Sequence, residues 1–335
     1  MKQHMQAIEI TQPGGPEVLK PTQRPVPMPK PNEVLIKIKA AGVNGPDVMQ
    51  RKGLYNPPEG VTDIPGLEVS GVIVAMGDAV KQQQFKMGDE VCALIAGGGY
   101  AEYAVAPAAN VMPTPQGLSM VEAAIMPENF MTVWAHLFMR AEFSASKSIL
   151  IHGGTSGIGT TATMLCRALG ATKIFTTVGS EAQQQASIKL GADVAINYHT
   201  EDFVAQVKQH TEDQGVDFVL DIIGGDYVAR NYQAAAMNGT IVQIGVAHGK
   251  VTELDLFPML AKRLTHLGAT LRSQTVAQKA EIIRQLQQHV WPLFAAEKIK
   301  PQLFNSYPLA DAHLAHEQLA KGGHIGKLVL LNDQS

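Results

Sequence analysis

The pattern of apolar and polar positions changes along the chain. Up to about residue 120, short apolar or alternating segments are separated by turns rich in proline and glycine. Segments of this length and spacing are typical of strands in a compact β-barrel. We expect such strands at 34–40, 69–75, 90–94 and 101–105.

From residue 148 onward, β-branched segments alternate with stretches of helical periodicity. This alternation predicts a parallel sheet with helices on both faces. The strands are expected at 149–151, 173–178, 194–196, 218–222 and 240–244, with helices at 157–169, 181–190, 201–211 and 227–236. Further helices are expected at 121–138, interrupted near Pro127, and at 276–294.

The last apolar segment, 325–331, reads as a strand that returns to the first domain rather than extending the parallel sheet. The predicted fold class is therefore α/β, with a Rossmann-type doubly wound parallel sheet and a separate β-barrel. We expect the barrel domain to comprise 1–121 with 298–335, and the dinucleotide-binding domain to comprise 122–297.

A glycine-rich turn follows the first strand of the predicted sheet. Residues 148–159 read SILIHGGTSGIG, a strand, a turn and the start of a helix. Glycines at such a turn let backbone N–H groups and a helix N-terminus approach a pyrophosphate. A turn of this kind also occurs for structural reasons alone, so the dinucleotide interpretation depends on its context.

The end of the second strand bears on which dinucleotide binds. Sites selective for NADH place a carboxylate there for the ribose hydroxyls, whereas this chain has Gly179 and Ser180. These residues leave space and a hydroxyl donor for a 2′-phosphate. Glu181 follows immediately, and no arginine or lysine lies in the next several residues to offset its charge. The pattern favours NADPH over NADH.

Composition limits the remaining possibilities. The chain has 335 residues, a formal net charge of −3 and two cysteines, Cys92 and Cys166. This charge does not favour binding to nucleic acid or to anionic membranes, and two cysteines are too few for a disulfide framework. No apolar run approaches the ~20 residues that span a bilayer, and the first residues lack the pattern of a secretory signal. We expect a cytoplasmic protein.

Several motifs carry a family resemblance: residues 41–47 (AGVNGPD), 65–71 (PGLEVSG), 127–134 (PENFMTVW), 221–225 (DIIGG) and 326–330 (GKLVL). The chain resembles the zinc-independent medium-chain dehydrogenases/reductases of the quinone oxidoreductase type, which include zeta-crystallin and the tumour-suppressor-inducible quinone oxidoreductases. The resemblance implies a GroES-like barrel and a Rossmann domain, with the active site in the cleft between them. It also implies NADPH as cofactor and assembly as a homodimer or homotetramer.

The resemblance further implies roles for individual residues. The pyrophosphate would be held by Gly154, Thr155, Ser156, Gly157 and Ile158, and the 2′-phosphate would be surrounded by Gly179, Ser180 and Tyr198. The nicotinamide and substrate side would be formed by Asn44, Tyr55, Thr132, Ile244, Gly245 and Leu271. One position departs from the pattern: Gln183 stands where similar enzymes have a phosphate-binding lysine.

Simpler interpretations of four of these side chains stay open. Asn44 could cap a local turn, and Tyr55 could anchor its loop on the barrel. Thr132 could bond the backbone of its own helix. Tyr198 could be an ordinary surface aromatic residue.

The resemblance also bears on metal binding. Asn44 and Leu67 occupy positions where zinc-dependent relatives have a cysteine and a histidine, and Glu68 alone cannot hold catalytic zinc. His313 and His316 are spaced i, i+3 and are expected on an exposed helix face. We therefore expect no metal site. Without a metal, hydride transfer to an electron-poor acceptor is easier than alcohol oxidation.

The leading hypothesis is an NADPH-dependent quinone reductase in which Tyr55 and Asn44 position the acceptor. A second hypothesis is reduction of a conjugated C=C bond in an enone, alkenal or enoyl thioester. A third, a non-enzymatic NADPH-binding protein, also stays open. A short-chain dehydrogenase is disfavoured, because no tyrosine is followed four residues later by lysine and about 150 residues precede the glycine turn.

Overall fold

The computed structural model describes residues 3–80, 84–251 and 253–332. Its packing divides the chain into two units, unit 1 with residues 1–131 and 274–335, and unit 2 with residues 132–273. These limits differ from the domain boundaries that we expected, since segments 122–131 and 274–297 belong to unit 1. One reason is aromatic packing inside unit 1, where the Phe130 and Phe294 ring centroids lie 5.2 Å apart.

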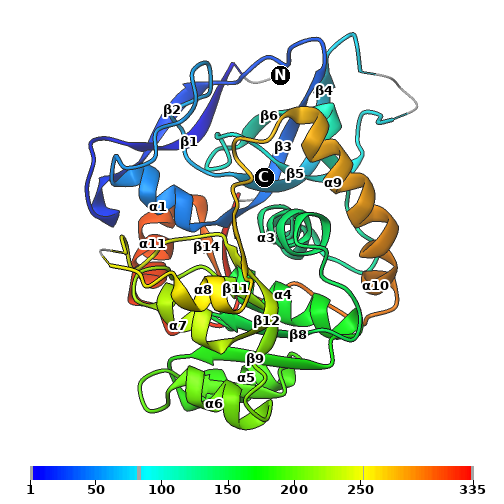
Figure 1. Cartoon of the computed structure of the whole chain (residues 1–335). Coiled ribbons are helices and arrows are strands. Elements are labelled where there is room, and N and C mark those ends of the chain that lie inside the picture. The colour runs from blue at the N-terminus through cyan, green and yellow to red at the C-terminus, as the bar shows by residue number, and fades with distance from the viewer. Residues whose placement is uncertain (1–2, 81–83, 252, 333–335) are drawn as a thin grey trace. The chain divides into compact units, whose positions relative to one another are not determined.

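Unit 1 is built around a sheet of seven strands in the order β14-β15-β3-β4-β5-β7, with β6 paired to β3 and a separate β1–β2 pair (Figure 1). The strands are β1 (His4–Ile10), β2 (Leu19–Pro25), β3 (Glu33–Val43), β4 (Glu68–Met76), β5 (Glu90–Leu94), β6 (Tyr103–Pro107), β7 (Val111–Pro113), β14 (Leu303–Pro308) and β15 (Lys327–Leu331). The long strand β3 pairs antiparallel with β4, β6 and β15. A large apolar cluster of unit 1 includes Val34, Ile36, Val69 and Leu330, and a smaller one includes Ala40, Ile125 and Val329.

The four strands expected in the first domain are confirmed as parts of β3, β4, β5 and β6. The return of the last strand is also confirmed, because β15 pairs with β3 from Leu328 opposite Val43 to Leu331 opposite Ala40. Only long-range pairing decides this placement, since an apolar strand of five residues fits either sheet by composition.

The helices of unit 1 are shorter than the periodicity predicted. The expected helix 276–294 is divided into α9 (Val276–His289) and α10 (Trp291–Ala295). Pro292 explains the break, because proline has no N–H to donate and its ring clashes with the preceding turn of a helix. The other helices that begin in this unit are α1 (Gly45–Arg51), α2 (Met120–Ala124), α3 (Pro127–Val133) and α11 (Ala312–Lys321), with short 3-10 turns at Pro16–Val18, Ala108–Asn110 and Leu309–Asp311.

Unit 2 contains six parallel strands in the order β10-β9-β8-β11-β12-β13. They are β8 (Ser148–His152), β9 (Lys173–Val178), β10 (Val194–Asn197), β11 (Val216–Asp221), β12 (Ala235–Gln243) and β13 (Thr265–Gly268). The chain runs outward from β8 in one direction through β9 and β10, then returns to start again at β11. Such a reversal marks the place where a doubly wound sheet binds its ligand, at the carboxyl ends of the strands.

Helices connect these strands as the sequence predicted: α4 (Gly157–Ala168), α5 (Glu181–Lys189), α6 (Phe203–His210) and α7 (Tyr227–Ala234), with α8 (Phe257–Ala261) before β13. Because crossovers are right-handed, the reversal of direction places α4 and α5 on one face and α6 and α7 on the other. On one face of the sheet, Phe203, Val207 and Tyr232 pack in one apolar cluster with the strand residues Leu150 and Val219. The C-terminal part of the expected helix 121–138 is a π-helix, Trp134–Arg140, and not an α-helix. Among the described residues, no helix is long and apolar enough to cross a bilayer.

Candidate functional site

The glycine turn of unit 2 joins β8 to α4, and its backbone requires glycine. Gly153 has φ +68°, in the left-handed region, and a Cβ on Gly159 would lie 2.1 Å from the carbonyl oxygen of Gly153. A Cβ on Gly154 would lie 2.6 Å from the Cβ of Thr176. Ser156 caps α4, because its hydroxyl accepts the N–H of Gly159 at 3.0 Å. The turn is therefore a cradle that side chains would fill, which fits a pyrophosphate at a helix N-terminus.

Below this turn lies a buried polar network that sequence reasoning missed. The Gly153 N–H donates to the Thr177 hydroxyl at 3.3 Å, and Thr177 contacts His152 Nδ1 at 3.0 Å. His152 Nε2 lies 2.7 Å from Asn231 Oδ1, and the Asn231 amide donates to Asp221 at 2.8 Å.

These bonds fix the tautomer of His152. Because Asn231 uses its N–H toward Asp221, its oxygen accepts, so the His152 proton is on Nε2 and Nδ1 accepts the Thr177 hydroxyl. Burial lowers the pKa of His152, which keeps it neutral as this pattern requires. The hydrogen bonds of this network thus hold the glycine turn in place through the Gly153 N–H. A histidine directly before a glycine turn was the signal in the sequence.

The residues expected around a 2′-phosphate lie together where β9 ends. A Cβ on Gly179 would meet the Tyr198 hydroxyl at 2.6 Å, so the tyrosine lies directly over this glycine. The Ser180 hydroxyl accepts the N–H of Gln183 at 3.3 Å and caps α5, which leaves its own proton available to donate. Gln183 accepts the Gly179 N–H at 2.9 Å. Glu181 is exposed.

The remaining expected residues of unit 2 are placed as follows. Ile244 and Gly245 follow β12 at the same carboxyl edge of the sheet, and both N–H groups donate to the Asp221 carbonyl, at 2.8 and 3.4 Å. Leu271 and Thr132 are buried. The Thr132 hydroxyl has no hydrogen-bond partner among the described residues, so it does not bond its own helix. A buried hydroxyl without a partner is costly, which fits a ligand that would complete it.

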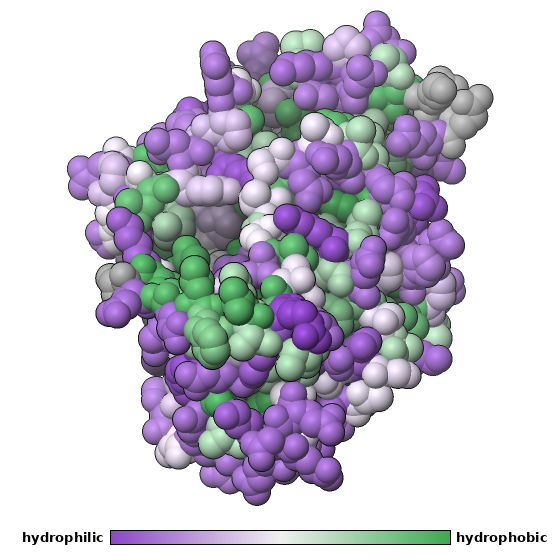
Figure 2. Space-filling view, viewed as in Figure 1, coloured by the Kyte–Doolittle hydropathy of each residue, from purple (hydrophilic) through white to green (hydrophobic). Residues whose placement is uncertain are grey.

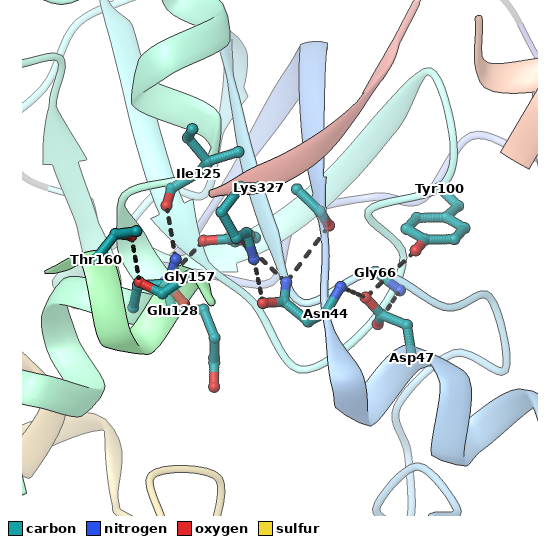
Figure 3. A network of polar contacts seen from close by, with 12 residues as sticks. Asn44, Asp47, Gly66, Tyr100, Ile125, Glu128, Gly157, Thr160 and Lys327 are labelled. Atoms are coloured by element: carbon teal, nitrogen blue, oxygen red, sulfur yellow. Dashed lines mark hydrogen bonds and ion pairs between the residues drawn. The ribbon is translucent and has the colours of Figure 1, made fainter. Parts of the chain in front are cut away.

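In unit 1, the Asn44 side chain belongs to a buried ionic cluster (Figure 3). Lys327 Nζ lies 2.7 Å from Glu68 Oε1 and also donates to Asn44 Oδ1, and Asn44 Nδ2 donates to Glu68 Oε1 at 3.0 Å. The side chains of Lys327 and Glu68 are 7% and 0% exposed. Gly42 makes room for this pair, because a Cβ there would lie 2.2 Å from Glu68 Oε1. The amide of Asn44 is thus oriented by a salt bridge and is more than a turn cap.

Asp47 lies three residues later and fixes the backbone around Asn44. Its two oxygens accept the N–H groups of Asn44 at 2.8 Å and Gly66 at 3.1 Å, and the Tyr100 hydroxyl lies 3.3 Å away. Burial raises the pKa of Asp47 to about 7, while the hydrogen bond from the Asn44 N–H opposes this shift.

The chain of contacts continues to His316, and here our expectation was wrong. We expected an exposed helix face, but His316 is fully buried. Its Nε2 lies 2.9 Å from the Tyr100 hydroxyl and its Nδ1 lies 3.2 Å from the Arg51 guanidinium. Since arginine only donates, Nδ1 accepts and the Nε2–H donates to Tyr100. Burial, aided by the charge of Arg51, lowers the pKa of His316 to about 3, so the ring is neutral. His313 is only partly exposed.

The remaining expectations concern Tyr55, a metal site and the two cysteines. Tyr55 lies in the loop after α1 and is partly exposed. In the part of the chain that the structure describes, no group of three His, Cys, Asp or Glu side chains is arranged to hold a metal ion. Cys92 and Cys166 are both buried and free.

One unit of this chain is a barrel-type sheet with an oriented polar cluster, and the other is a doubly wound sheet with a glycine turn that has space for a phosphate group. This combination is typical of nucleotide-dependent oxidoreductases. Residues 30–116 match the Alcohol dehydrogenase GroES-like domain family, and residues 157–287 match the Zinc-binding dehydrogenase family. The quinone oxidoreductase of Mus musculus is 32% identical over 334 residues, with 98% of each chain covered. The chain belongs to the medium-chain dehydrogenases/reductases of the quinone oxidoreductase type.

Solved structures agree with this assignment. The Escherichia coli quinone oxidoreductase complexed with NADPH has a TM-score of 0.86 and 31% identity, over 97% of this chain and 99% of that one. An NAD-dependent alcohol dehydrogenase has a TM-score of 0.87 and 30% identity, over 98% of this chain and 100% of that one. The fold alone therefore does not select the dinucleotide.

Proposed function

We propose that this protein transfers hydride from NADPH to quinones or similar conjugated carbonyl compounds. The observation that carries the choice of cofactor is the end of β9, where Gly179 and Ser180 replace a ribose-binding carboxylate and Tyr198 lies over the glycine. The choice of acceptor follows the quinone oxidoreductases to which the chain is similar over nearly its whole length.

When bound, NADPH supplies a hydride at C4 of its nicotinamide ring. The glycine turn and Ser156 would hold the diphosphate through backbone N–H groups. Ser180, whose lone pair already caps α5, would donate its proton to the 2′-phosphate. The Thr132 hydroxyl, which lacks a partner among the described residues, would bond the nicotinamide carboxamide.

On the acceptor side, Asn44 and Tyr55 would orient the carbonyl oxygen. Asn44 Nδ2 donates one N–H to Glu68 Oε1 at 3.0 Å, and Nδ2 lies 3.5 Å from the Gly42 carbonyl oxygen, at the limit of a hydrogen bond. The N–H on the Gly42 side is only weakly bonded, and it would donate to the acceptor. Positioning of two reactants in one geometry is the main contribution that such residues make.

The test is NADPH oxidation with a panel of benzoquinones and naphthoquinones beside an enone and an alkenal, followed by product analysis. Turnover of quinones to hydroquinones, with NADPH preferred to NADH, supports the proposal. Inert quinones with saturation of the enone C=C bond would assign the second activity instead. Tight NADPH binding with no oxidation by any acceptor would favour a non-enzymatic binding role.

We also propose that the protein forms a homodimer through unit 2. Hydrophobic residues gather over α8 (Figure 2), and Val246, Leu256, Phe257 and Leu260 are each more than half exposed. Exposed apolar patches of this kind mark interfaces, and β13 ends the described sheet with an unpaired edge. Sedimentation of the wild type and a Leu260→Glu variant tests this, since the variant should be monomeric. Two free buried cysteines accord with the reducing cytoplasm that we propose as its location.

A further inference from the structure

The polar network under the glycine turn of unit 2 extends to a second loop of the same unit. At the far end of the network, the Asp221 carboxyl group accepts three N–H groups. Its Oδ1 accepts those of Ile223 at 2.6 Å and Gly224 at 3.0 Å, and its Oδ2 accepts the Asn231 amide at 2.8 Å. Ile223 and Gly224 belong to the loop that follows β11. The network therefore connects two loops at the carboxyl edge of the parallel sheet.

The backbone of Asp221 adds a third loop to this connection. Its carbonyl oxygen accepts the N–H groups of Ile244 and Gly245, at 2.8 and 3.4 Å. These two residues follow β12 and are the ones expected on the nicotinamide side of a bound dinucleotide. Asp221 thus holds the loops after β11 and β12 in fixed positions relative to each other.

All side-chain donors of the network point in one direction. The Thr177 hydroxyl donates to His152 Nδ1. The His152 Nε2–H donates to Asn231, whose amide donates to Asp221. Because Thr177 uses its proton toward His152, its oxygen is left to accept the Gly153 N–H of the glycine turn. The glycine turn and the loop after β11 therefore lie at the two ends of one chain of oriented hydrogen bonds.

His152 lies in the middle of this chain, and packing fixes its ring. The side chain is fully buried. The rings of Phe203 and Tyr227 lie edge-to-face with it, each with its centroid 4.8 Å from that of His152. Imidazole suits the position because one rigid ring offers both an acceptor and a donor. Rotation of the ring would leave both nitrogens without partners in a buried site, which is costly.

We propose that His152 is a positioning residue of the dinucleotide site. It aligns the glycine turn with the loop after β11 and, through Asp221, with the residues on the nicotinamide side. The inference rests on the proposed function, because it requires a dinucleotide that binds along the carboxyl edge of this sheet. His152 does not touch the ligand in this role. It acts by preorganisation, since loops that already have the bound geometry lose less freedom when the ligand binds.

The experiment measures NADPH affinity by calorimetry in the wild type, Thr177→Val, Asn231→Leu and the double variant. Valine has the shape of threonine without its hydroxyl, so Thr177→Val removes the contacts with Gly153 and His152. Leucine is close to asparagine in size and has no amide, so Asn231→Leu separates His152 from Asp221. The two substitutions thus interrupt the chain on opposite sides of the imidazole ring.

Ser187→Ala is the matched control variant. Ser187 is fully buried in α5, and its hydroxyl lies 2.7 Å from Oγ1 of Thr176, the neighbour of Thr177 on β9. The variant loses a buried hydrogen bond to the same strand and leaves the His152 network complete. The control ligand is 2′-AMP, which has the adenosine 2′-phosphate but no diphosphate and no nicotinamide.

We expect each single variant of the network to bind NADPH about tenfold more weakly, the order of effect that one lost hydrogen bond has. The double variant should bind no more weakly than the weaker single variant, because both substitutions interrupt the same chain at His152. The affinity of every variant for 2′-AMP should match that of the wild type. Ser187→Ala should bind NADPH as the wild type does.

The outcomes separate this inference from the proposed function. If the wild type binds NADPH and both Thr177→Val and Asn231→Leu bind it equally well, the inference is wrong and the function stands. Losses that multiply in the double variant, or an equal loss of affinity for 2′-AMP, also overturn the inference, since they indicate independent or general damage. If the wild type binds neither NADPH nor NADH, both are wrong. If it binds NADH alone, the proposed cofactor is wrong and the comparison is made with NADH.

NMR of ¹⁵N-labelled histidine gives a readout that needs no ligand and no variant that folds poorly. The ring signals of His152, assigned by their loss in His152→Gln, should show a neutral imidazole with its proton on Nε2. A proton on Nδ1 in the wild type would reverse the direction of the chain and overturn the inference.

Discussion

Replacing Lys327 by methionine tests the unit 1 cluster most directly. Methionine keeps the apolar stem of lysine but removes the ammonium group that lies 2.7 Å from Glu68 Oε1. Glu68 is fully buried, so its carboxylate would lose its cationic partner with no access to water. Breaking a buried ion pair in this way costs about 3–5 kcal/mol, because an uncompensated charge stays behind.

For a unit of this size, a loss of about 3–5 kcal/mol lowers Tm by roughly 6–20 °C. Thermal and urea unfolding of the Lys327→Met variant measures the effect. The double variant Lys327→Met/Glu68→Gln should recover most of the lost stability, because it removes the stranded charge, and the cycle isolates the coupling between the two residues.

Lys300→Met is the matched control. Lys300 lies 2.6 Å from Glu122, a pair of the same chemistry, but its side chain is 60% exposed. Exposed pairs contribute under about 1 kcal/mol, so Lys300→Met should unfold close to the wild type. If Lys327→Met is no less stable than Lys300→Met, our account of the buried cluster is refuted.

Three further predictions follow from single positions. Glu128→Gln should raise the free energy of unfolding at pH 8 by on the order of 1–3 kcal/mol. The pKa of the Glu128 carboxyl group is about 7 in the folded protein against an ordinary 4.5, so the wild type loses stability as the pH rises from 4.5 to 7, and the advantage of the variant should vanish below pH 4.5. An equal stabilisation at pH 4 would contradict this. Gly159→Ala should abolish NADPH binding in calorimetry and lower the free energy of unfolding by about 1–3 kcal/mol, because the new Cβ would lie 2.1 Å from the Gly153 carbonyl oxygen. The control Gly268→Ala has open space around its Cβ, so it should bind NADPH as the wild type does. Gln183→Lys should raise the preference for NADPH over NADH by about tenfold through a charge-assisted bond to the 2′-phosphate, and an unchanged ratio of the two dissociation constants would exclude that position from the phosphate site.

The sequence identified the elements of unit 2 because their signals are local. Each strand of the parallel sheet is buried on both faces, so it reads as a short β-branched run, and each helix between strands has its own periodicity. Ser156 and Ser180 precede helices as caps, and the glycines between β8 and α4 mark a turn that only glycine can form. The interruption expected near Pro127 is confirmed by the break between α2 and α3, whereas the break at 290 was less visible, since helical periodicity continues across it.

The unit 1 cluster could not be read from the sequence in the same way. Asn44, Glu68 and Lys327 come from three distant segments, and only the pairing of β15 with β3 brings Lys327 to the other two. His316 shows the same limit. Its spacing from His313 predicted an exposed face, but the packing of α11 inside unit 1 buries the ring against Tyr100 and Arg51.

Local chemistry along the chain thus determined the fold class, the glycine turn between β8 and α4, and the family. The tertiary structure decided which polar groups are satisfied: Glu68 and Asp47 each accept several hydrogen bonds, whereas the buried Thr132 hydroxyl has no partner among the described residues. The physical reason is that burial and charge at a side chain are set by every segment that packs around it, and those segments are far apart in the sequence.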